Sequence, residues 1–503
     1  MQDPIDDSSS QSPHPDEAKA EEPAGIPQES PADSNNPVIT GSQGTLAPMT
    51  DSSSLDASSL QAESTPAFDS TIPITPMLDL MRLDPSRILF IQLKAAEPSM
   101  ERRKMSPEDV KLDRTYQTEN EDLTDEIEKL PASLCRSLTF PSAIRAYGST
   151  RELFDSIVAL LLKHVPLTEK DCLLVTYWAI ATWFLDFLPF LPSLILTGPA
   201  LAADRLLRTL LAICRRPLLL ADVSSAVLLN LPLSGLRPTL LIRKPQLNGR
   251  LAALFDASNR RGYLAYGGKN FHELYCAKCI YIGEQGRPPE TVPNSIHIHV
   301  SGESRRTLSE LPTDTVVQAF QEKLLFYRFL WHDPVADSKF RVSQLHFRPE
   351  VAAIVQSLAA PLVSEPDLKR GIMELLQERD EQSRVDIASS LNGVLLRAVL
   401  FYCHQADKQK VFVREIAEVA SGICREEGES RRISSESAGF VLKDLGLYSR
   451  RLGSAGRGLI LDRATQSQVH RLAYAYDVVP SEPHCGNCQS LQAPENEELV
   501  QGV

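Results

Sequence analysis

The pattern of apolar and polar residues separates a polar N-terminal stretch from a body built of helices and strands. Apolar positions recur at helical spacing through residues 151–164 and again through 170–188. Short apolar runs then alternate with helical stretches, in the order strand, helix, strand, helix, strand, across residues 193–242. Because strands that alternate with helices pair in parallel, this order predicts an α/β domain with a parallel sheet.

The pattern changes after this alternation. Three further strands are predicted near residues 262–265, 279–283 and 295–300, and residues 315–404 are helical almost throughout. From residue 409 the pattern predicts two helices, a basic β-hairpin and a last helix over residues 466–476. A helix–helix–hairpin order of this kind is typical of a winged helix.

Composition completes the division of the chain. Ser, Pro, Asp and Glu dominate the first 75 residues, which offer little to bury, so we expect a disordered acidic tail there. The predicted segments are a tail at 1–75, an adaptor region at 76–149, the α/β core at 150–312, a helical region at 313–390, a winged-helix module at 391–479 and a polar tail at 480–503.

The charge of the chain is concentrated in its first part. Residues 1–80 hold fourteen Asp and Glu against the single Lys19, which accounts for the whole net charge of −13. The remaining 423 residues are therefore neutral. This balance favours neither a polyanion mimic nor a strongly basic nucleic-acid binder, so any charge argument must be local.

Cysteine usage and hydropathy bear on location. Nine Cys, an odd number in a large chain, are typical of reduced thiols, and no signal-like segment opens the chain, so we expect a cytoplasmic protein. The run Leu173–Leu201 is apolar except for Asp186, which we interpret as a turn former or cap. Pro189 and Pro192 interrupt the run, so we favour a buried helix and strand over a membrane span.

The phrases LILTGPA and RPTLLI, with the order of elements around them, carry a resemblance to a known family. Residues 194–300 resemble the core of helicase-like and primase-associated P-loop ATPases. Over residues 150–478 the chain also resembles a group of uncharacterised bacterial proteins that join such a core to a C-terminal winged helix. The resemblance implies a P-loop NTPase-like sheet with a phosphate loop, an acidic strand and a sensor strand.

The phosphate loop is degenerate in this sequence. Such a loop needs glycines that let backbone N–H groups wrap the phosphates, a Lys for the β and γ oxygens, and a hydroxyl for Mg²⁺. Gly198 takes the first glycine position, but Ala203, Asp204 and Arg205 stand at the Gly, Lys and Ser/Thr positions. A register shifted by one residue puts Arg205 at the Lys position and still leaves the hydroxyl missing.

The acidic strand is degenerate as well. Arg243 and Lys244 follow PTLLI, where Asp and Glu would hold Mg²⁺ and orient water. Farther along, Asn294 stands where an Arg would stabilise the transferring phosphoryl group. We therefore predict no ATP hydrolysis, no catalytic residue and no cofactor.

Two CxxC pairs are the main candidates for a metal site. They are Cys276 with Cys279, and Cys485 with Cys488 in the phrase HCGNC. The alternatives are one shared four-thiolate zinc site, metal capture by HCGNC alone, and ordinary thiols. We favour ordinary thiols and predict no metal. His297 and His299 alternate on a strand and are interpreted as surface residues.

The C-terminal module holds a local surplus of positive charge. Residues 431–471 contain eight basic residues against three acidic ones. We expect Ser435 to cap a helix that carries Lys443, and expect Arg450, Arg451 and Arg457 on the wing.

These features predict a non-catalytic, helicase-like scaffold with DNA or other proteins as partners and no membrane partner. The DNA contact is assigned to Ser435, Lys443, Arg450, Arg451 and Arg457. The alternative is a protein–protein adaptor without nucleic-acid contact.

Overall fold

The computed structural model describes most of the chain beyond residue 76. The described residues are 77–84, 87–97, 104–113, 130–243, 248–267, 270–284, 294–301, 308–338, 347–405, 407–478 and 485–492. The predicted acidic tail at 1–75 lies outside the described residues, as does the predicted polar tail apart from 485–492.

A parallel sheet of five strands forms the centre of the fold and confirms the predicted fold class. The strands lie in the order β10-β4-β9-β6-β5, which is consistent with a P-loop ATPase-like core. Their bounds are β4 (Ser193–Thr197), β5 (Pro217–Leu220), β6 (Thr239–Ile242), β9 (Ala277–Tyr281) and β10 (Ser295–His299). The strand predicted near 262–265 is instead β7 (Leu264–Gly267), which pairs antiparallel with β8 (Asn270–Glu273) in a separate hairpin.

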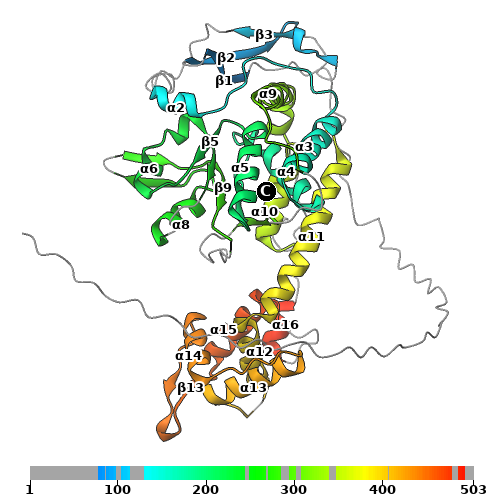
Figure 1. Cartoon of the computed structure of the whole chain (residues 1–503). Coiled ribbons are helices and arrows are strands. Elements are labelled where there is room, and N and C mark those ends of the chain that lie inside the picture. The colour runs from blue at the N-terminus through cyan, green and yellow to red at the C-terminus, as the bar shows by residue number, and fades with distance from the viewer. Residues whose placement is uncertain are drawn as a thin grey trace, which may run out of the picture. The chain divides into compact units, whose positions relative to one another are not determined.

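Helices cover both faces of this sheet because its strands are apolar on both sides. Leu194 and Leu196 of β4 pack into one hydrophobic cluster, and Ile195 between them packs into another. Figure 1 shows α5 with α3, α4 and α9 on one side of the sheet, and α6 with α8 on the other. The bounds are α3 (Thr150–His164), α4 (Glu169–Thr182), α5 (Ala200–Ile213), α6 (Ser225–Asn230), α7 (Leu233–Leu236), α8 (Gly249–Ala257) and α9 (Asp314–Ala336).

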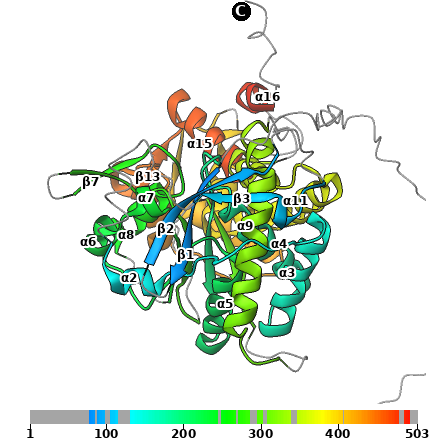
Figure 2. The ribbon, with the colours of Figure 1, turned by 90° about the horizontal axis from the view of Figure 1, so that it is seen from above.

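An antiparallel sheet precedes the parallel one in the chain. Its strands are β1 (Met77–Asp84), β2 (Arg87–Ala95) and β3 (Val110–Asp113), and the short helix α2 (Ala132–Ser137) follows. Figures 1 and 2 both show this sheet against α9. Met77, Met81 and Ile91 belong to the same hydrophobic cluster as the helices α3, α4 and α5. The first described strands therefore share the core of the α/β domain.

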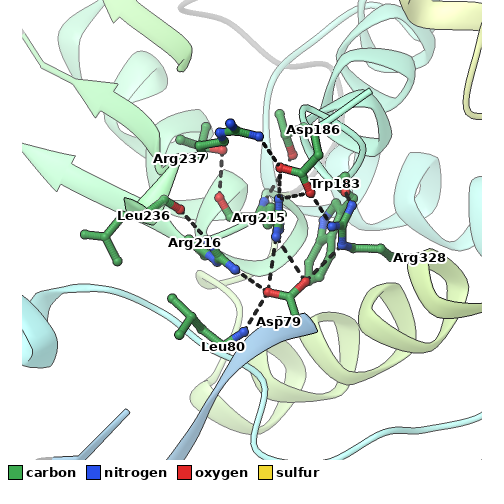
Figure 3. Close-up of polar contacts among 11 residues, drawn as sticks. Asp79, Leu80, Trp183, Asp186, Arg215, Arg216, Leu236, Arg237 and Arg328 are labelled. Carbon is green, nitrogen blue, oxygen red and sulfur yellow. Dashed lines mark hydrogen bonds and ion pairs between the residues drawn. The ribbon is translucent and has the colours of Figure 1, made fainter. Parts of the chain in front are cut away.

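One buried carboxylate joins the two sheets. Asp79 of β1 is 3% exposed and accepts hydrogen bonds from Arg215 Nη2 at 3.1 Å, from Arg328 Nε at 2.9 Å and from Arg216 Nη2 (Figure 3). Burial alone would raise the pKa of Asp79, but the three guanidinium groups hold it well below its usual range. Ionised Asp79 thus stabilises the fold at neutral pH, and this stabilisation is lost as the pH falls below about 3.8.

Asp186 completes this charge network and is an ion-pair partner, so its interpretation as a turn former or cap was incomplete. It accepts from Arg215 at 3.2 Å, from Arg237 at 3.0 Å and from Arg328 (Figure 3). The network still holds more guanidinium groups than carboxylates. Its excess positive charge is offset by backbone carbonyls, including Leu236 O and Trp183 O, and by the C-terminal end of α5, where the helix dipole is negative.

The outer strand β10 has a backbone contact from the helical region. His297 and His299 are exposed on one face of β10, as predicted, and Ile296 and Ile298 are buried on the other. Arg379 of α11 donates to the His297 carbonyl at 3.0 Å and also pairs with Asp171 of α4. The edge of the parallel sheet is therefore tied to two helices.

The chain continues as helices and ends in a small second core. The helices are α10 (Pro349–Ala359), α11 (Pro366–Ser389), α12 (Leu391–Cys403), α13 (Val413–Glu426), α14 (Ser435–Asp444), α15 (Arg463–Ala475) and α16 (Gly486–Gln492). A three-stranded sheet of β11 (Lys410–Phe412), β13 (Arg457–Ile460) and β12 (Arg450–Arg451) packs with α12 to α15. The helix–helix–hairpin order predicted from the sequence is present.

The apolar run at 173–201 forms the buried helix α4, a turn and strand β4. No single helix among the described residues is long and apolar enough to cross a membrane. Helices α11 and α12 meet the criteria of length and composition only as a pair, which is bent by 63°.

The charge network predicts a large effect of Asp79→Asn. The substitution leaves Arg215, Arg216 and Arg328 buried without their shared counter-charge, so we expect a loss of about 3–5 kcal/mol in the free energy of unfolding. Denaturant unfolding of the full chain measures it. Asp113→Asn is the matched control, since its pair with Lys94 in the same sheet is partly exposed and is worth about 1 kcal/mol or less. Equal shifts in the two variants would contradict the role of Asp79.

Candidate functional site

The connection between β4 and α5 is the position of the predicted phosphate loop. Strand β4 ends at Thr197 and α5 begins at Ala200, so only Gly198 and Pro199 lie between them. Pro199 has no N–H, and the turn itself therefore offers only the N–H of Gly198. A phosphate loop wraps its ligand with several successive N–H groups, which a two-residue turn does not supply.

Ala203, Asp204 and Arg205 were predicted at the Gly, Lys and Ser/Thr positions of the degenerate phosphate loop. All three lie inside α5, and the Ala203 N–H donates to Pro199 O at 3.0 Å as the first bonds of a helix do. Ala203 is fully buried. The apolar residues of ALAADRLL repeat at helical spacing, which accounts for the helical conformation of this segment.

Gly198 is required by a close backbone contact. Its φ is +112°, and a Cβ at this position would lie 2.0 Å from Val300 O, just beyond the end of β10. The Val300 N–H donates to Thr197 O at 2.9 Å, and the buried hydroxyl of Tyr281 donates to Gly198 O at 2.9 Å. The glycine therefore serves the packing of β10 and β9 around the turn.

The charged residues near this turn bind one another. Asp204 accepts from Arg208 at 2.9 Å, and its second oxygen lies 3.9 Å from Arg243 Nε, beyond the end of β6. Arg205 turns away and donates to the carbonyls of His164 and Ser309. Arg243 thus lies at the end of the strand predicted to be acidic. Lys244 lies outside the described residues.

Asn294 does not lie at the end of the sheet where the β4–α5 turn is. It precedes Ser295, which pairs with Ser193 at the start of β4, whereas Gly198 follows the end of β4. Since the two strands are parallel, Asn294 is at the opposite edge. The proposed correspondence between Asn294 and a phosphoryl-stabilising Arg was wrong.

The first CxxC pair does not form a metal site. Cys276 packs on one face of the parallel sheet and Cys279 on the other, as the alternation along a strand predicts. Both thiols are fully buried, and burial raises the pKa of each. These are properties of core cysteines.

The C-terminal module places some of the predicted DNA-binding residues differently. Ser434, not Ser435, caps α14, since its hydroxyl accepts from the Ser437 N–H at 3.1 Å. Ser435 is the first residue of the helix and is exposed. Lys443 is exposed in the last turn of α14, as expected.

The three arginines of the hairpin are exposed, but they do not share one face. Arg451 lies directly opposite Arg457, and Arg450 lies opposite Gly458. Cross-strand partners share a face and successive residues alternate, so Arg451 and Arg457 lie on one face and Arg450 on the other. Leu459, two residues after Arg457, is buried in the module's core, so the pair is on the face of the sheet that packs on the helices.

The geometry at Gly198 predicts opposite effects for two Gly→Ala substitutions. Gly198→Ala forces a Cβ against Val300 O at a positive φ, so we expect a loss of at least about 1–3 kcal/mol in the free energy of unfolding. Gly249→Ala at the start of α8 meets nothing within 4 Å and should be neutral or stabilising by up to about 1 kcal/mol. Thermal and denaturant melting of the full chain test this, and a harmless Gly198→Ala would contradict it.

Comparisons with known proteins give only distant likenesses. No family model and no curated protein matches the sequence. Among solved structures, the apo C-terminal region of NrS-1 is 11% identical, with 76% of this chain and 97% of that chain covered and a TM-score of 0.30. Drosophila ORC bound to DNA is 11% identical over 70% and 99% of the two chains, with a TM-score of 0.17. Cdc6p from Pyrobaculum aerophilum is 13% identical over 64% and 98%, with a TM-score of 0.19. These TM-scores are too low to assign a function.

Proposed function

We propose that this chain is a non-catalytic, helicase-like pseudo-ATPase that acts as a scaffold. The observation that carries the proposal is the two-residue turn between β4 and α5. It leaves the P-loop-like sheet without the length of backbone that would surround a triphosphate. The sheet and its covering helices still form a complete hydrophobic core. In this proposal the domain therefore serves as a scaffold.

The charges around the turn favour the same proposal. Mg²⁺-dependent phosphoryl transfer needs carboxylates for the metal and cations directed at the phosphates. In this chain Asp204 lies near two arginines, Arg208 and Arg243, and Arg205 is held by backbone carbonyls. The charged groups closest to the turn are thus engaged within the protein.

We expect purified full-length protein to show no Mg²⁺-dependent ATP turnover above a mock preparation. A phosphate-release assay tests this, with Asp204→Ala and Arg243→Ala as variants of two charged residues near the turn. Any background activity should be the same in both variants and in the wild type. Turnover that disappears in either variant would overturn the proposal, because a contaminating ATPase would be unaffected by them.

The second part of the proposal is that the module at residues 391–479 is a winged helix that contacts DNA. Lys443 at the end of α14 and the pair Arg451 and Arg457 on the hairpin are exposed cations, and the pair lies on the helix-facing side of the sheet. A winged helix uses its second helix and its hairpin in this way. The local surplus of five positive charges supports weak, salt-sensitive binding.

A protein-binding adaptor is the second candidate function, and two exposed aromatic residues favour it. Phe440 on α14 is 63% exposed, and Tyr448 before the hairpin is 70% exposed. Large exposed apolar side chains are typical of protein interfaces. Salt dependence separates the two candidates, since phosphate contacts release counterions and apolar contacts do not.

We expect full-length protein to bind duplex DNA with an affinity that falls as salt rises. If Arg451 and Arg457 each neutralise one phosphate, the double Arg→Ala variant should show a log–log salt slope shallower by about 1.8. Arg450→Ala, on the opposite face, is the matched control. It should change the salt slope by less than half of the change that each arginine contributes in the double variant. The free energy of unfolding should change by about 0.5 kcal/mol or less in each variant, since these side chains are exposed.

Electrophoretic shift titrations across salt concentrations measure these slopes. Absence of binding by the wild type even at low salt would favour the adaptor. Equal effects of Arg450 and of the Arg451–Arg457 pair would contradict the assignment to one face.

A further inference from the structure

Four potential metal ligands from distant parts of the sequence meet in the C-terminal module. They are His404 at the end of α12, His470 on α15, Cys485 just before α16 and Cys488 in its first turn. Their ligand atoms all lie within 4.8 Å of one another. The two cysteines are the HCGNC pair for which the sequence favoured ordinary thiols, and the two histidines were not considered, because 66 residues separate them in the chain.

The distances within this group match the edges of a tetrahedron around a zinc ion. Zn–S bonds of about 2.3 Å and Zn–N bonds of about 2.0–2.1 Å give edges of about 3.8 Å for S–S, about 3.6 Å for S–N and about 3.3 Å for N–N. The two sulfurs are 3.7 Å apart and the two Nε2 atoms 3.2 Å apart. Cys485 Sγ lies 3.1 Å from His470 Nε2, and Cys488 Sγ lies 3.2 Å from His404 Nε2. Each distance is within about 0.5 Å of the tetrahedral value.

The surroundings of His470 prepare it to bind a metal. Its Nδ1 lies 2.7 Å from the carbonyl of Gln466, one turn earlier on α15. A carbonyl only accepts, so Nδ1 carries the proton and Nε2 presents its lone pair to the other three ligands. A hydrogen bond from the second ring nitrogen is the usual support of a metal-bound histidine.

The burial of the group indicates a structural site. Cys488 is fully buried and His470 is 2% exposed, and His404 and Cys485 are half-buried. Four protein ligands with two sulfurs and two nitrogens fill a tetrahedral site and leave no position open for a substrate. The same donor set selects zinc over Mg²⁺ or Ca²⁺, which prefer oxygen.

Few of the described side chains in the segment that carries the cysteines are buried. Among the side chains described in residues 485–489, only that of Cys488 is fully buried, and Gly486 and Gln489 are exposed. These exposed residues bury too little apolar surface to offset the conformational entropy that they lose when they become ordered. A metal ion shared with α12 and α15 would supply the missing stabilisation.

We propose that His404, His470, Cys485 and Cys488 bind one structural Zn²⁺ ion that attaches α16 to α12 and α15. This proposal is independent of the proposed function, since it involves neither the β4–α5 turn nor the arginines of the hairpin.

The first test is the metal content of full-length protein. After purification in a reductant and dialysis against metal-free buffer, elemental analysis should find about one zinc per chain, and Co²⁺ substitution should give the absorption of a tetrahedral thiolate site. Less than one tenth of an equivalent, also after incubation with Zn²⁺, would overturn the proposal. Formation of a Cys485–Cys488 disulfide in the reduced preparation would overturn it too. Neither result depends on a variant that folds.

The second test uses variants of the cysteines. Cys485→Ser/Cys488→Ser should lower the zinc content at least tenfold. Cys424→Ser, a buried thiol of the same module outside the group, should retain about one zinc per chain. A strong chelator should lower the melting midpoint of the module in the wild type and in Cys424→Ser, but not in the double variant. Full zinc content in the double variant would overturn the assignment of these ligands.

Discussion

The fold depends on the placement of one negative charge among three buried guanidinium groups. Asp79 comes from the first described strand, and Arg215, Arg216 and Arg328 come from the α5–β5 connection and from α9. Arg215 and Arg216 follow directly on α5, so their attachment to Asp79 fixes the C-terminal end of that helix. The other end of α5 begins two residues after β4. The geometry of the turn at Gly198 is therefore coupled, through one rigid helix of about 21 Å, to a strand at the beginning of the described chain.

Charged side chains also pair with one another where β4 and β6 end. In an active P-loop enzyme the charges at this edge are left for a metal and a nucleotide, whereas here Asp204 and its neighbouring arginines interact among themselves. Surface pairs of this kind stabilise a protein weakly. Their effect is that these charged groups are paired within the protein, which agrees with the proposed non-catalytic scaffold.

The sequence predicted those features that depend on local periodicity, and it missed those that depend on distant contacts. Strand β4 has its predicted bounds, and the alternation of His297 and His299 with isoleucines placed both histidines on one face. The helical spacing of ALAADRLL likewise predicted the helix that follows β4, which is α5. The roles of Asp79, His404 and His470 follow from partners 15 to 249 residues away, most of them too distant for a local pattern to reveal. Only the folded structure shows that His404 and His470 lie beside the pair Cys485 and Cys488.

Arg379 has a consequence for the behaviour of the protein at high concentration. Strand β10 is one of the two outer strands of the parallel sheet, and an outer strand can pair with a strand of another molecule and so start aggregation. The guanidinium group of Arg379 donates a hydrogen bond to the carbonyl of His297, and the salt bridge to Asp171 holds that guanidinium in place. One carbonyl of the outer strand is thus engaged within the molecule. The same arginine that links α11 to α4 also makes the sheet a poorer template for intermolecular β-pairing.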